Sequence, residues 1–110
     1  MYRDSDSFIR KLVEERKKPL LLLLLKNVGV FELIEVEKIL KDKKFETLDV
    51  LLQTVGGSPD WAFQIAKILG ESAKHITIII PLFAKSAGTL ISLIGDSFVL
   101  TELSELGPLD

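Results

Sequence analysis

The sequence of 110 residues contains no cysteine and a single histidine, His75. Disulfide bridges, thiolate metal sites and metal centres built from several histidines are therefore excluded, and no metal or cofactor is predicted. The longest apolar run, Leu20 to Leu25, is far shorter than the roughly 20 residues that a membrane-spanning helix needs. The N-terminus, with Asp4 and Asp6, does not resemble a signal peptide. We expect membrane association only through segments outside these residues. The sequence does not decide in which cellular compartment the protein is found.

The sequence also lacks a large excess of one sign of charge: 14 basic and 16 acidic residues give a net charge of −2. The most basic stretch, Arg10 to Lys18, is interrupted by Glu14 and Glu15, which is typical of a solvated helix face. No nucleic-acid partner is predicted. Apolar residues make up 47% of the chain, which is enough to fill the core of one small domain or of part of a larger one.

Hydrophobic periodicity and breaker residues predict helices and strands in alternation. The expected order is helix, strand, helix, strand, helix and strand, at residues 4–18, 20–25, 31–43, 48–52, 59–69 and 75–80. Residues 83–88 then lead into a helix that ends at Gly95, followed by a strand at 97–100 and a loop at 101–110. Apolar strands that alternate with helices indicate an α/β fold, with a parallel sheet covered by helices on both faces.

Two of these helices carry specific signals. Ser58, Pro59 and Asp60 together form a helix start, and Gly70 predicts the end of that helix, which should bury Ala62, Ile65, Ala66 and Leu69. The helix at 31–43 should bury a face made of Phe31, Ile34, Ile39 and Leu40.

Two turns follow the carboxyl ends of neighbouring predicted strands, where parallel sheets form their sites. Gly56 and Gly57 can take positive φ and turn N–H groups outward toward negative charge, although they could equally form a plain tight turn. Ser86 lies between a strand and a helix in the frame Ala-Lys-Ser-Ala-Gly, like a nucleophile elbow, or it could simply cap its helix. Together, a serine and an outward N–H group are what acyl transfer needs.

Four segments also carry a family resemblance: Leu52 to Pro59, Ile78 to Pro81, Ala84 to Ile91 and Leu106 to Asp110. They look like the serine dehydrogenase proteinase family, which is similar to the SppA signal peptide peptidases and has the ClpP/crotonase fold. The resemblance covers about residues 48–110 and is weaker upstream. One departure is Val55, which stands where a proline is common before the two glycines.

The resemblance implies a role for five residues. Ser86 is the expected nucleophile, Gly57 and Ala87 supply the oxyanion N–H groups, and Gly56 and Gly88 shape the two turns. It also implies a peptide or protein substrate and assembly into a homo-oligomer. No cofactor is implied, because nothing in these residues suggests hydride transfer.

The base that would activate Ser86 is missing from the sequence. ClpP-like enzymes resemble one another in using a histidine after the serine, and SppA-like ones in using a lysine, but no lysine, histidine or arginine follows Ser86. His75 opens a strand roughly 20 Å away. Lys85 is adjacent to Ser86, but neighbours around a sharp bend usually point apart, so we expect Lys85 to face solvent or substrate rather than to act as the base. Thr89 and Ser92 should pack the helix, and Glu102, Glu105 and Asp110 should be surface or turn groups.

We therefore expect the domain to continue beyond Asp110, and these 110 residues alone to be inactive. A natural end there would favour an inactive or self-assembling module. Three functions remain open: a serine peptidase of the SppA/ClpP type, a crotonase-like acyl-CoA enzyme on the same fold, and a non-catalytic peptide-binding module. The serine favours the peptidase over coenzyme A chemistry, and the missing base favours the module.

Overall fold

The computed structural model describes residues 2–80, 83–84, 87–100 and 105–106. Helices and strands alternate through most of this part of the chain, as predicted. The elements are α1 (Tyr2–Arg16), β1 (Leu20–Leu25), α2 (Val30–Leu40), β2 (Phe45–Thr54), α3 (Pro59–Ser72), β3 (Ala73–Ile80), β4 (Phe83–Ala84), α4 (Ala87–Ser92), β5 (Ser97–Leu100) and β6 (Glu105–Leu106).

The strands form one sheet in which every recorded pair is parallel. Its strands are connected in the order β5-β3-β2-β4-β6. β3 and β4 share one edge of β2, and β1 pairs with the opposite edge. The predicted α/β fold with a parallel sheet and flanking helices is confirmed. The short strands β4 and β6 fall where a turn and a loop were expected, because two residues of pairing leave no periodicity to read.

The long central strand β2 has one partner, β1, on one side and two successive partners on the other. β3 pairs with it from Phe45 to Leu51, and β4 takes over at its carboxyl end, where Thr54 pairs with Ala84. The segment that follows β4 is thereby brought beside the turn that follows β2. This exchange of partners is what places the two predicted turns together.

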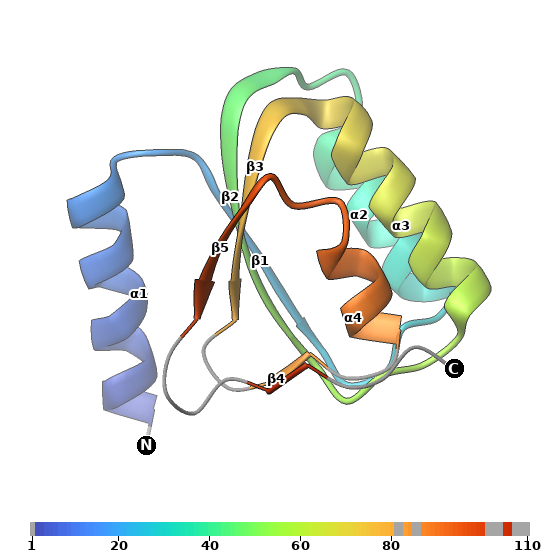
Figure 1. Cartoon of the computed structure of the whole chain (residues 1–110), viewed down its shortest axis with the longest axis horizontal. Helices are drawn as coiled ribbons and strands as arrows, with labels where there is room; N and C mark the ends of the chain where they lie inside the picture. Colours follow the sequence, from blue (N-terminus) through green and yellow to red (C-terminus); the bar gives the residue numbers. More distant parts are fainter. Residues whose placement is uncertain (1, 81–82, 85–86, 101–104, 107–110) are drawn as a thin grey trace.

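The sheet is sandwiched between helices, with α1 on one side and α2, α3 and α4 on the other (Figure 1). Alternate residues of β2 (Leu48, Val50 and Leu52) point into the core on the α2–α3 side. The completely buried members of this core, at 0% exposure, are Val28, Val50, Leu52, Ala62, Ile65, Leu69, Ile78, Ile80, Ala84 and Ile91.

The opposite face of β2 carries a buried charge. The Asp49 side chain is 4% exposed and forms an ion pair with Arg16 at the end of α1. Arg16 donates from Nε at 2.5 Å and from a terminal nitrogen at 3.1 Å to the two carboxylate oxygens. These hydrogen bonds raise the pKa of the Arg16 guanidinium, while its partial burial works in the opposite direction. The pair ties α1 to the centre of the sheet.

Two expectations about the helices are wrong. α3 continues through Gly70 to Ser72, whose hydroxyl donates to the Ile68 carbonyl at 2.7 Å. In α2 Leu40 is buried as predicted, together with Val36, but Phe31, Ile34 and Ile39 are 76%, 42% and 48% exposed. The buried stripe of α2 is rotated from the predicted one, because its neighbours rather than its own periodicity decide which side is covered. The predicted buried residues of α3 are all correct.

Candidate active site

The two predicted turns meet at the carboxyl edge of the sheet. β2 ends at Thr54 and leads into Gly56 and Gly57, while β4 ends at Ala84 and leads toward α4. Thr54 and Ala84 are register partners in the parallel sheet, so both chains leave it side by side. The predicted nucleophile Ser86 and its neighbour Lys85 lie outside the described part of the chain.

The glycine turn has a backbone conformation that few other residues adopt. Gly56 and Gly57 have φ angles of 127° and 144°. A Cβ built on Gly57 would overlap the backbone of Val28, which follows β1 and forms a parallel bridge with Gly57. Glycine is therefore required at position 57 for two reasons, the dihedral angle and the close approach of another backbone.

Hydrogen bonds around this turn orient the Gly57 N–H group. Val28 N–H donates to the Gly56 carbonyl at 2.9 Å, and Ser58 N–H donates to the Val28 carbonyl at 2.9 Å. Because the N–H and C=O of a trans peptide point in opposite directions, the Gly57 N–H points away from Val28. Within the described ranges it has no hydrogen-bond partner, and Gly57 is partly accessible to solvent.

The start of α4 packs closely against the end of β2. A Cβ built on Gly88 would overlap the Thr54 methyl group, so only glycine allows this approach. The Thr89 hydroxyl donates to the Ala84 carbonyl at 2.9 Å, which links α4 back to β4. Described residues on both sides of positions 85–86 are thus held against Thr54. Of the predicted site residues, Gly56, Gly57, Ala87 and Gly88 belong to this region.

Sequence reasoning missed Thr54 as a site residue. Its side chain is 1% exposed, and its hydroxyl oxygen accepts a hydrogen bond from Gly56 N–H at 3.1 Å. A threonine hydroxyl that binds the backbone two residues further on is a known turn signal. The pattern Thr-x-Gly could therefore have been recognised, but its contact with Gly88 depends on the tertiary structure.

The other candidate bases and polar groups lie elsewhere. His75 is at the amino end of β3, where its Nε2 lies 3.1 Å from the Ser97 hydroxyl. Ser92 is buried and donates to the Thr89 carbonyl at 2.7 Å, which confirms its packing role. Glu102 and Asp110 lie outside the described residues, and Glu105 is the first residue of β6.

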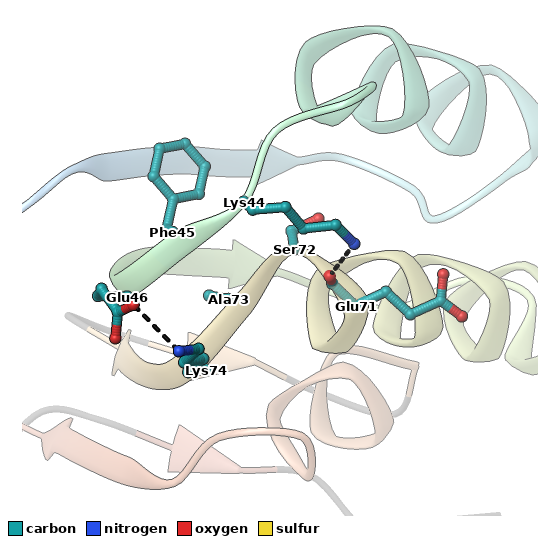
Figure 2. Close-up of a pocket in the computed structure, with 7 residues that line it drawn as sticks. All are labelled: Lys44, Phe45, Glu46, Glu71, Ser72, Ala73 and Lys74. Atoms are coloured by element: carbon teal, nitrogen blue, oxygen red, sulfur yellow. Dashed lines mark hydrogen bonds and ion pairs between the residues drawn. The ribbon is translucent and has the colours of Figure 1, made fainter.

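A pocket of about 290 Å³ opens at the opposite, amino edge of the sheet (Figure 2). Three of its charged side chains contact the protein itself: Lys44 Nζ donates to the Glu71 backbone carbonyl at 2.8 Å, and Lys74 pairs with Glu46 at 3.1 Å. Parallel sheets place their sites at the carboxyl edge, whereas this pocket lies at the amino edge. We therefore place the candidate site at the glycine turn.

The described ranges contain no cluster of three or more acidic, histidine or cysteine side chains that could hold a metal ion. None of their helices is long and apolar enough to cross a membrane.

The fold and the two turns define an α/β domain of the ClpP-like type, and comparisons with known proteins agree. The family model of the ClpP-like SDH-type serine proteinases matches residues 9–110. The chain belongs to this family, so the resemblance found in the sequence is confirmed.

Two curated relatives are uncharacterized proteins of Methanocaldococcus jannaschii. MJ0137 is 39% identical over 67 residues, which are 61% of this chain and 23% of that protein. MJ1495 is 36% identical over 63 residues, which are 57% of this chain and 22% of that protein. The match thus spans less than a quarter of the length of either relative.

A solved structure shows the same fold at lower identity. It is the 1510-N membrane-bound stomatin-specific protease, solved as a lysine-to-alanine mutant in complex with a substrate peptide. The TM-score is 0.62 at 20% identity, and the match covers 84% of this chain and 45% of that one. At this identity the likeness establishes the fold alone.

Proposed function

We propose that this chain carries the nucleophile and the oxyanion-binding groups of a serine peptidase. Ser86 is the nucleophile, and the Gly57 and Ala87 N–H groups bind the oxyanion. One observation carries the proposal: Thr54 pairs with Ala84, before Ser86, and contacts Gly88, after it. Ala84 and Gly88, which flank Ser86 in the sequence, are thus both held against Thr54, which precedes Gly56 by two residues.

The reaction follows from these groups. The Ser86 hydroxyl oxygen attacks the carbonyl carbon of a peptide bond while a base takes its proton. The carbonyl oxygen becomes an oxyanion, which accepts hydrogen bonds from the Gly57 and Ala87 N–H groups. The C–N bond then breaks, and the amine leaves with the proton. Water hydrolyses the acyl ester on Ser86 and regenerates the hydroxyl.

The base is proposed to lie outside these 110 residues. No lysine, histidine or arginine follows Ser86, and His75 is engaged with Ser97 at the amino end of β3. The chain corresponds to less than a quarter of its curated relatives and to 45% of the solved protease, so either has room for a further catalytic residue.

A non-catalytic peptide-binding module is the competing function. The absence of a basic side chain after Ser86 favours it, because a serine hydroxyl without a base is a poor nucleophile. A crotonase-like acyl-CoA enzyme would use the same two N–H groups but would have no need of Ser86.

The test is covalent labelling of the protein expressed from its natural gene with a fluorophosphonate probe. We expect labelling that disappears in Ser86→Ala and persists in Ser97→Ala, a control that removes the hydroxyl beside the only histidine. A folded protein that takes up no probe would favour the binding module. Labelling that disappears in Ser97→Ala instead would assign the nucleophile to the His75 pair.

A further inference from the structure

One buried side chain, that of Thr54, contacts both turns of the candidate site. Its hydroxyl oxygen accepts the Gly56 N–H at 3.1 Å and lies 3.4 Å from the Gly56 carbonyl oxygen. Its methyl group lies against Gly88 at the start of α4. Its backbone pairs with Ala84 of β4. Thr54 is 1% exposed, so solvent cannot replace these contacts.

We propose that Thr54 is a positioning residue that fixes the Gly57 N–H relative to the serine turn. The catalytic part of this inference rests on the proposed function, whereas the coupling of the two turns does not. Thr54 would act through Gly56 and Gly88 and would not itself contact the substrate.

The two ends of the side chain have separate tasks. The hydroxyl accepts from the Gly56 N–H and donates to the Gly56 carbonyl at 3.4 Å. That carbonyl belongs to the peptide that carries the Gly57 N–H, so the two contacts together limit rotation of the donor. Gly56 has a φ of 127°. Because a glycine can adopt many other backbone conformations, a contact from another residue is needed to hold this one. The methyl group acts as a spacer that sets how closely α4 approaches β2.

Chemistry makes this spacing matter. An oxyanion donor acts only when it lies within hydrogen-bond distance of the oxygen that develops charge, and a displacement of about 1 Å can cost as much as a hundredfold in rate. Threonine is the one residue type that offers a hydroxyl and a methyl group on the same β-carbon. Valine and serine each preserve one of the two functions.

The test therefore compares Thr54→Val with Thr54→Ser in the protein expressed from its natural gene. In Thr54→Val we expect amide hydrogen exchange at Gly56 to rise about tenfold, as loss of a buried hydrogen bond of roughly 1.4 kcal/mol implies. The maximal rate of fluorophosphonate labelling should fall by a similar factor, with the half-saturating probe concentration unchanged. In Thr54→Ser the exchange rate at Gly56 should stay at the wild-type value, because the hydroxyl is kept. The amide signal of Gly88 should change, because the methyl group is lost.

Thr77→Val is the matched control, because Thr77 is a buried threonine of β3 (3% exposed) at a distance from both turns. It should change neither readout. Unchanged exchange at Gly56 in Thr54→Val would overturn the inference, and so would an unchanged Gly88 signal in Thr54→Ser, which can be read even if the valine variant fails to fold. If the wild type takes up no probe but both amides respond as expected, the proposed function fails and the coupling of the turns stands.

Discussion

Removal of the Arg16 side chain should destabilise the protein far more than removal of another charge from the same helix. The Asp49 carboxylate is 4% exposed and receives two hydrogen bonds from Arg16, at 2.5 and 3.1 Å. Arg16→Met would leave that charge buried without its partner, which typically costs about 3–5 kcal/mol. Because Arg16 is itself 27% exposed, water can reach the vacated position, so we expect the low end, about 3 kcal/mol.

For a domain of this size, each kcal/mol lowers the midpoint of thermal unfolding by about 4 °C, so we expect a drop of roughly 12 °C. The assay is thermal and urea unfolding followed by circular dichroism. Lys11→Met is the matched control, since Lys11 pairs with Glu15 at 3.9 Å across the exposed surface of α1. Its effect should stay below about 0.5 kcal/mol.

A second substitution tests the cause. In the Arg16→Met background, Asp49→Leu removes the buried charge and should recover much of the lost stability. The reasoning is refuted if Arg16→Met costs no more than Lys11→Met, or if the double variant is no more stable than Arg16→Met alone. Either result would mean that the pair does not hold α1 on the sheet.

Two glycine substitutions should act in opposite directions. Gly57→Ala, at a φ of 144° and against the Val28 backbone, should cost about 1–3 kcal/mol and strongly slow probe labelling; a variant that labels at the wild-type rate would contradict the proposed oxyanion role. Gly70 lies inside α3 with open space around it, so Gly70→Ala should raise the free energy of unfolding by about 0.5–1 kcal/mol, as measured by urea unfolding. Gly95→Ala is its control and should destabilise, because the new methyl group would overlap the Ile78 side chain.

The fold class could be read from the sequence because it depends on local patterns. The all-leucine run at 20–25 and the β-branched run at 75–80 predicted two strands of the sheet correctly. The expectation that β1 is covered on both faces is wrong, because Leu22 and Leu24 are 43% and 56% exposed. Ser58 and Pro59 marked the start of α3 correctly, since a proline at the first helical position gives up no hydrogen bond. Gly70 misled, because a glycine costs a helix only about 1 kcal/mol and the buried residues of α3 outweigh that.

The sequence by itself determined the alternation of the helices with the longer strands, the two glycines that accept positive φ and the family, since each of these depends on short local segments of the chain. Only the tertiary structure decided which side of α2 is buried, that β4 replaces β3 beside β2, and that Thr54 contacts both turns. These features join residues as much as 34 positions apart, such as Thr54 and Gly88. Periodicity reports which residues avoid water, whereas the packing of distant segments selects the neighbours that they meet.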